Sequence, residues 1–275
     1  MKSAPFTYQA ALTAQAAVAT ITADSAPRIL AGGQSLVPML NLRLAPADAL
    51  LDITRIAEFR AVTESPTSVR YGATITHAAF EDGLVPDASN GLMRHVAGQI
   101  AYRAVRNRGT IGGAIALADP AADWVTVAIA LEAVLHLVSK AGMRQVSAQD
   151  FILGPYFTAL DEGELIAAVE VPKRSATERW GHRKVVVKTG EYAESMAIAM
   201  IDRPRNAARL VLGANDGAPI VLERVAAAIL SGTSEDAWKA EVRAELIAAQ
   251  RDFSPAKLIM HTTTVLRAAK DASET

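Results

Sequence analysis

Two glycine pairs, each placed between an expected strand and an expected helix, constrain the fold of this chain more than any other feature. The first pair lies in Ala31–Ser35 (Ala-Gly-Gly-Gln-Ser), shortly before Pro38, which a helix tolerates only in its first turn. The second lies in Thr110–Ala114 (Thr-Ile-Gly-Gly-Ala), before Asp119-Pro120, which favours a helix start. Because glycine has no Cβ, backbone N–H groups there can converge on an anion, which the dipole of the following helix attracts. Both segments are therefore predicted to be anion-binding loops, although either one by itself also fits an ordinary tight turn.

The two loops together suit a diphosphate group that is approached from two sides. The hydroxyls of Ser35 and Thr110 and the backbone of Gly112 and Gly113 are the expected additional donors. The chain contains neither Gly-x-Gly-x-x-Gly nor the Walker lysine motif, so a dinucleotide would not be bound by the Rossmann arrangement.

Composition excludes several other functions. The net charge is −1 and no dense Lys/Arg face appears, which argues against nucleic-acid binding. The 275 residues include no cysteine, so the chain can hold neither a disulfide nor a Cys-ligated iron–sulfur cluster, and its five histidines lack close metal-ligand spacing. No apolar run is long enough for a membrane span and no signal peptide is recognisable, which predicts a soluble, cytoplasmic protein.

Apolar patterning predicts an α+β fold. In the first 55 residues, an alanine-rich helix over 9–20 and parallel strands over 28–31 and 49–53 form a small α/β unit. A larger mixed unit follows, with a helix capped by Thr76, a helix over 90–105, and the helix from Asp119-Pro120 that carries Trp124 in the core. Its strands are expected over 68–73, 133–139, 143–146 and 164–171.

The polar stretch Lys173–Arg179 is the candidate domain boundary. Beyond it, strands are expected over 183–187, 196–201, 210–213 and 219–222, the last two flanking the turn Asn215-Asp216-Gly217. The remainder, from about 223 to 270, is predicted to be mostly helical.

The segments Ile29–Pro38 and Arg106–Gly113 closely resemble the FAD-binding medium subunits of molybdenum hydroxylases, the carbon monoxide dehydrogenase and xanthine dehydrogenase family. The resemblance covers nearly the whole chain and continues through residues 51–53, 72–78, 118–123, 164–166, 171–172, 184 and 191–193. It implies a two-part FAD domain of the p-cresol methylhydroxylase type over residues 1–175, with subdomains 1–55 and 60–175. A small C-terminal domain with an antiparallel sheet and helices would occupy 178–275.

The resemblance also implies which residues contact FAD. The pyrophosphate would be wrapped by Ile29, Leu30, Ala31, Gly32, Gly33, Gln34, Ser35 and Leu36, and closed from the second side by Thr110, Ile111, Gly112, Gly113 and Ala114. Asp123 would bond the sugar-like chain of the flavin, and Ile100 and Ile166 would supply apolar contacts. Lys184 would lie near the isoalloxazine, where a cation stabilises negative charge on the reduced ring, and Tyr192 would lie against that ring.

The chain departs from the family pattern at Ala114, where relatives often have Ser or Asn, and at Lys188 and Glu191, where Arg and a Gly- or Asp-type residue are expected. These departures bear on the ring environment more than on the pyrophosphate.

Without the resemblance, simpler interpretations remain open for several of these residues. Asp123 could merely complement a helix dipole, Lys184 could be a solvated strand residue, and Tyr192 could be core packing. His77 would fill a helix start. The basic residues at a helix end would form a solvated face or, alternatively, contact the cofactor or a partner subunit, namely Arg103, Arg106 and Arg108.

In such enzymes electrons pass from a molybdenum centre in a large subunit through [2Fe-2S] clusters in a small subunit to FAD in the medium subunit, and then to an acceptor. The resemblance thus implies an oxidoreductase subunit with no catalytic acid, base or nucleophile of its own. It also implies molybdopterin and iron–sulfur partner subunits, in a dimer of heterotrimers. Two alternatives stay open: a self-contained FAD oxidase or reductase of the same fold, and an assembly subunit that holds no flavin.

Overall fold

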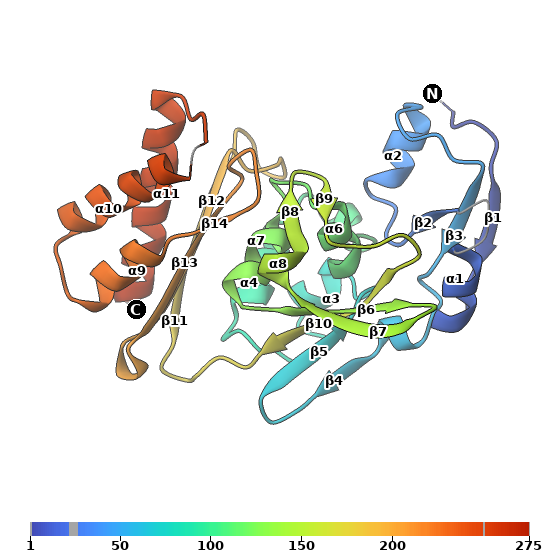
Figure 1. Cartoon of the computed structure of the whole chain (residues 1–275), viewed down its shortest axis with the longest axis horizontal. Coiled ribbons are helices and arrows are strands. Elements are labelled where there is room, and N and C mark those ends of the chain that lie inside the picture. The colour runs from blue at the N-terminus through green and yellow to red at the C-terminus, as the bar shows by residue number, and fades with distance from the viewer. Residues whose placement is uncertain (1, 22–26, 250, 275) are drawn as a thin grey trace.

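The computed structural model describes residues 2–21, 27–249 and 251–274. Three sheets follow one another along the long axis of the molecule, from the N-terminal strands through a central sheet to the C-terminal strands (Figure 1). Helices pack between and outside these sheets, and a small two-stranded ribbon completes the structure. The predicted α+β class is confirmed.

The N-terminal unit is a three-stranded parallel sheet with two helices. Its elements are β1 (Thr7–Ala10), α1 (Ala14–Ile21), β2 (Arg28–Leu30), α2 (Leu36–Asn41) and β3 (Ala49–Asp52), and the strand order is β1-β3-β2. The predicted helix over 9–20 was wrong in its first part. Parallel pairing of β1 with β3 overrides the helix propensity there, and the Thr13 side chain accepts a hydrogen bond from the Ala16 N–H at the start of α1.

The central unit is a five-stranded antiparallel sheet of order β4-β5-β10-β6-β7. Its strands are β4 (Val62–Glu64), β5 (Ser68–Gly72), β6 (Val134–Ser139), β7 (Gly142–Ser147) and β10 (Leu165–Pro172), and the ribbon is β8 (Ile152–Gly154) and β9 (Phe157–Thr158). Its helices are the 3-10 helix η1 (Glu58–Arg60), α3 (His77–Glu81), α4 (Leu92–Gln99), α5 (Arg103–Arg106), α6 (Ile111–Leu117), α7 (Asp123–Ala130) and α8 (Ala148–Phe151). The Thr76 side chain caps α3 as predicted.

Two predicted helices of this unit differ in the structure. The helix over 90–105 is broken into α4 and α5 at Ala101, whose φ is 42°, and the Arg106 guanidinium satisfies the freed carbonyls of Ile100 and Ala101. The helix expected from Asp119-Pro120 instead begins at Asp123. The Asp119 carboxylate accepts from the Ala121 N–H and so stabilises a turn in place of a helix cap.

The C-terminal unit is a four-stranded antiparallel sheet covered by three helices (Figure 1). Its elements are β11 (Arg179–Val185), β12 (Ser195–Asp202), the 3-10 helix η2 (Arg203–Arg205), β13 (Ala207–Gly213), β14 (Ile220–Val221), α9 (Glu223–Leu230), α10 (Glu235–Ala248) and α11 (Pro255–Glu274). Every residue of β12 is buried, because alternate side chains enter two different cores. Ile198 and Met200 join the central core, whereas Ala199 and Ile201 face the helices.

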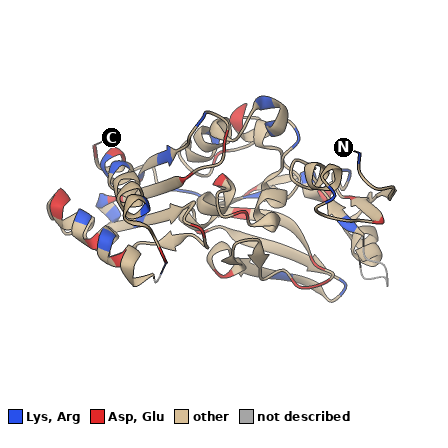
Figure 2. Ribbon diagram, turned by 90° about the horizontal axis from the view of Figure 1, so that it is seen from above, with Lys and Arg blue, Asp and Glu red and all other residues tan. Residues whose placement is uncertain are grey.

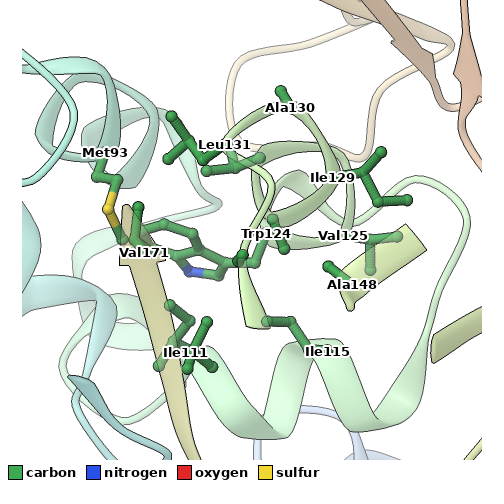
Figure 3. Close-up of a cluster of buried hydrophobic side chains, with 14 of the residues drawn as sticks. Met93, Ile111, Ile115, Trp124, Val125, Ile129, Ala130, Leu131, Ala148 and Val171 are labelled. Carbon is green, nitrogen blue, oxygen red and sulfur yellow. The ribbon is translucent and has the colours of Figure 1, made fainter. Parts of the chain in front are cut away.

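The central core surrounds α7, all of whose residues are buried. Trp124 lies there among Met93, Ile111, Ile115 and Val171 (Figure 3), as the sequence predicted for this side chain. At the C-terminal end, basic and acidic residues alternate over the helices (Figure 2), with ion pairs such as Lys270–Glu235. Within the described ranges, we find no helix with the length and apolar character that a membrane crossing requires.

Candidate functional site

The first glycine segment connects β2 to α2 in the strand–turn–helix order that the sequence predicted. Gly33 has a φ of 73°, in the left-handed region that glycine adopts without strain. The backbone N–H groups of four consecutive residues have no hydrogen-bond partner in the described part of the chain, namely Gly32, Gly33, Gln34 and Ser35. Unpaired N–H groups in a turn at a helix start are the donor set that binds an anionic group.

The second glycine segment is the first turn of α6 rather than a loop. Thr110 is its N-cap residue, and its hydroxyl oxygen accepts from the Gly113 N–H at 3.1 Å. The Gly112 N–H donates to the Ala73 carbonyl and the Ile111 N–H to the Ile75 carbonyl. The prediction that Gly112 and Gly113 offer free donors was therefore wrong. The Ala73 carbonyl accepts from the Gly112 N–H, and the Thr110 hydroxyl accepts from the Gly113 N–H. The Thr110 hydroxyl donates to no acceptor in the described part of the chain, so its proton can still be donated.

The structure packs the first glycine segment against the second one and against Arg108 and Gly109, the two residues that lead into it. A Cβ on Gly32 would lie 2.2 Å from the Arg108 carbonyl oxygen and 2.7 Å from the Gly109 Cα. A Cβ on Gly113 would lie 3.4 Å from the Ala31 Cβ. Gly32 is thus required by the close approach of two backbones, and the two segments form one continuous wall.

Asp123 and Lys184 form a buried ion pair. The Lys184 Nζ lies 2.8 and 3.0 Å from the two carboxylate oxygens, and each side chain is 6% exposed. Burial raises the pKa of Asp123, and the neighbouring ammonium acts in the opposite direction. The interpretation of Lys184 as a solvated residue was wrong. Asp123 is the first residue of α7, so it also complements the helix dipole.

Tyr192 lies on the segment between β11 and β12 and reaches the first glycine segment. Its ring is 59% exposed, so the alternative that it is core packing was wrong. Its hydroxyl lies near the Ser35 side chain and near the carboxylates of Asp119 and Asp123. Lys188 and Glu191, the two departures from the family pattern, are exposed on the same segment.

The remaining predicted residues line the surrounding elements. Ile166 is buried in β10, next to Ala167, whose carbonyl accepts from the Ala73 N–H beside the second glycine segment. Ile100 follows Gln99, whose carbonyl lies 3.5 Å from the Lys184 Nζ. The others are half-buried in β2 or at the starts of α2 and α6, namely Ile29, Leu30, Leu36 and Ala114.

Arg106 has a role that the sequence did not predict. Its side chain is only 12% exposed, donates to the Glu81 carboxylate, and so holds the pKa of Glu81 below its usual range. The solvated-face interpretation was therefore wrong for Arg106, although it fits Arg103. No local pattern could have revealed this contact, because Glu81 lies 25 positions away.

His77 also makes a contact that the sequence did not predict. It stands at the start of α3 as expected, but its ring is buried and its Nδ1 accepts from the Trp124 indole N–H at 2.9 Å. Burial and the nearby Arg106 lower the pKa of His77 to about 4, so the ring is neutral at physiological pH. The described residues include no cluster of three or more side chains that could ligate a metal ion.

Comparison with known families matches residues 4–174 to the family described as the FAD binding domain in molybdopterin dehydrogenase. The chain belongs to this family. Within it, the chain is 40% identical over 196 residues to the glyceraldehyde dehydrogenase medium chain of Sulfolobus acidocaldarius, covering 71% of this chain and 69% of that one. It is 35% identical over 221 residues to the carbon monoxide dehydrogenase medium chain of Hydrogenophaga pseudoflava, covering 80% and 77%.

Solved structures of the family have the same fold over the full length of this FAD-binding chain. Carbon monoxide dehydrogenase from Hydrogenophaga pseudoflava, in a form that lacks the Mo-pyranopterin moiety, superposes with a TM-score of 0.91 at 32% identity, covering 99% of each chain. Quinoline 2-oxidoreductase from Pseudomonas putida superposes with a TM-score of 0.88 at 30% identity, covering 100% of this chain and 99% of the other. The predicted family and its cofactor, FAD, are thereby confirmed, and the relatives are subunits of oxidoreductases.

Proposed function

We propose that this chain is the FAD-carrying electron-transfer subunit of a molybdenum hydroxylase. Electrons would arrive from [2Fe-2S] clusters in a small partner subunit, pass through FAD, and leave to an external acceptor, while a large partner subunit holds the molybdopterin. The observation that carries the proposal is the run of four backbone N–H groups at Gly32–Ser35 that find no partner among the described residues, set against the second glycine segment. The absence of cysteine supports this division of labour, since the clusters must then belong to another chain.

The geometry fits FAD. The unpaired donors at Gly32–Ser35 suit the pyrophosphate, and the Thr110 hydroxyl can add a donor from the other side. We keep the full predicted contact set as part of the proposal: Ile29, Leu30, Ala31, Gly32, Gly33, Gln34, Ser35, Leu36, Ile100, Thr110, Ile111, Gly112, Gly113, Ala114, Asp123, Ile166, Lys184 and Tyr192. FAD, when bound, supplies the electron-accepting and electron-donating chemistry, and the protein supplies binding, orientation and electrostatics.

The Asp123–Lys184 pair refines the expected role of the lysine. A lone ammonium beside the ring would favour negative charge there, whereas a lysine paired with a carboxylate has much of that effect cancelled. We propose that the Asp123–Lys184 pair orients polar groups at the FAD site. The net charge near the isoalloxazine ring would then depend on both residues. Tyr192, which is exposed and lies near Ser35, would cover the site from the C-terminal unit.

Substrate choice belongs to another subunit in this proposal. Relatives of similar sequence are named for glyceraldehyde, carbon monoxide and nicotine, and all three are medium chains or subunits. We further propose the domain division 1–175 (subdomains 1–55 and 60–175) and 178–275, which is supported by the N-terminal and central sheets lying before 175 and the C-terminal sheet after 178. The dimer of heterotrimers and the cytoplasmic location stay predictions.

Native purification tests this proposal. The chain should co-purify with a molybdopterin subunit and an iron–sulfur subunit, and it should contain FAD. A chain that purifies alone and turns over a substrate by itself would instead support the self-contained flavoenzyme. A chain that purifies with partners but shows no flavin absorbance and binds no added FAD would support the assembly subunit.

A further inference from the structure

His77 packs against Gly109, the residue that directly precedes the second glycine segment, and contacts it in two ways. Its backbone N–H donates to the Gly109 carbonyl at 2.9 Å. Its ring is so close to Gly109 that a Cβ there would lie 2.5 Å from Nε2. The neighbouring residues Thr76 and Thr110 form an isolated antiparallel bridge, so this part of the chain is also held by backbone pairing.

The ring of His77 is held from the opposite side by the central core. The Trp124 indole N–H can only donate, so the Nδ1 that receives it must carry no proton. In a neutral imidazole the proton is then on Nε2, the atom that faces Gly109. Trp124 itself is 1% exposed and packed among buried apolar side chains (Figure 3), which fixes the donor in place.

A chain of close contacts therefore runs from the core to the first glycine segment. Trp124 holds the His77 ring, the ring abuts Gly109, and the Arg108–Gly109 backbone abuts Gly32. Neither Gly109 nor Gly32 has a positive φ, so both are glycines because of these approaches and not because of their backbone conformation.

We propose that His77 is a positioning residue for FAD binding, which Trp124 fixes as the Nε2–H tautomer and which sets the spacing between the two glycine segments. This inference rests on the proposed binding of FAD at those segments. His77 acts through the Arg108–Gly109 backbone, so its effect is on the shape of the wall that the two segments form.

The tautomer can be measured without flavin. In the full chain labelled with 15N-histidine, two-bond 1H–15N spectra at neutral pH should show His77 protonated on Nε2 and not on Nδ1, with the signal assigned through the His77→Ala variant. A proton on Nδ1, or a charged ring at neutral pH, would overturn the proposal whether or not the chain binds FAD.

The contact with Gly109 can be tested by a double-mutant cycle on the dissociation constant of FAD. Gly109→Ala should weaken FAD binding about tenfold in the wild-type background, because its Cβ strikes the His77 ring and displaces the wall. In the His77→Ala background the ring is gone, so adding Gly109→Ala should change the dissociation constant by less than about threefold. Equal fold-changes in the two backgrounds would overturn the proposed coupling.

His261→Ala is the matched control for a general loss of stability. Like His77, His261 is a buried histidine that burial keeps neutral with a pKa of about 4, but it lies on α11, where its Nδ1 is bonded to the Ser195 hydroxyl. Its replacement should lower the melting temperature and leave the dissociation constant of FAD unchanged, whereas His77→Ala should raise that constant. If both variants bind FAD equally well, His77 is only a core residue. Should wild-type protein fail to bind FAD, the proposed function fails while the tautomer result still stands.

Discussion

Gly32→Ala tests the approach of the two glycine segments most sharply. The new Cβ would lie 2.2 Å from the Arg108 carbonyl oxygen and 2.7 Å from the Gly109 Cα, both of which are backbone atoms. Ordinary non-bonded contacts are about 3.5 Å, so the two segments must separate by about 1 Å. Overpacking of this kind costs about 1–3 kcal/mol. If this cost is met when the two segments close on the pyrophosphate, the dissociation constant of FAD rises about 5–150-fold.

The assay is a titration of flavin-free Gly32→Ala protein with FAD, followed by flavin fluorescence. Gly154→Ala is the matched control, because no atom lies within 4 Å of its new Cβ and Gly154 has no positive φ. Near-ultraviolet circular dichroism checks that both variants are folded. A folded Gly32→Ala protein that binds FAD as tightly as wild type would refute the assignment of the pyrophosphate to this wall.

Three further predictions follow from the same geometry. Gly33→Val forces a β-branched residue to a φ of 73° and should abolish FAD retention, seen as loss of flavin absorbance; a yellow, folded variant would contradict this. Lys184→Met leaves the Asp123 carboxylate buried without its partner and should lower the stability to urea by about 3–5 kcal/mol, with most of the loss recovered in the Asp123→Asn/Lys184→Met double variant. Flavin-loaded Lys184→Met should also show a lower flavin potential, and an unchanged potential would mean that the lysine does not influence the ring.

A separate prediction concerns acid stability. Burial depresses the pKa of His95 and, more strongly, the pKa of three other histidines, to about 4, 3 and 4, so the unfolded chain binds protons on these rings first as the pH falls through about 6.5. The contribution of these neutral rings to the free energy of unfolding is fully present above pH about 6.5. It is lost as the pH falls toward their pKa values in the folded state, at up to about 1.4 kcal/mol per pH unit for each of His77, His182 and His261. Urea unfolding between pH 5 and 6, where carboxylates still contribute little, should show this slope, and His261→Ala should remove about one third of it. A flat profile would contradict the assignment.

The first glycine segment was predictable because its determinants are local. A short apolar strand, two glycines, Ser35 at the N-cap position and Pro38 in the first helical turn all lie within a few residues. The second segment was predicted less well, because its donors are used by Ala73 and Ile75, which precede it by more than thirty positions in the sequence. A glycine pair by itself does not reveal whether its N–H groups remain free.

Long-range side-chain pairs account for the other differences. Asp123 and Lys184 were each predicted as site residues, but the ion pair between them, which joins α7 to β11 across 61 positions, has no sequence signal. The same holds for Trp124 and His77, which are 47 positions apart. The broken helix at Ala101 depends on Arg106, whose guanidinium satisfies the carbonyls that the break leaves free. Local propensity over 90–105 could not anticipate that compensation.

In the proposed function, electrons reach FAD in this chain from the iron–sulfur clusters of a partner. The most direct test is stopped-flow reduction of the isolated complex by its substrate, compared with the FAD-loaded chain alone. We predict that cluster absorbance bleaches before the flavin, that the complex stripped of FAD stops at reduced clusters, and that substrate leaves the flavin of the isolated chain oxidised. Reduction of the flavin by substrate in the isolated chain, at the rate seen in the complex, would contradict the account.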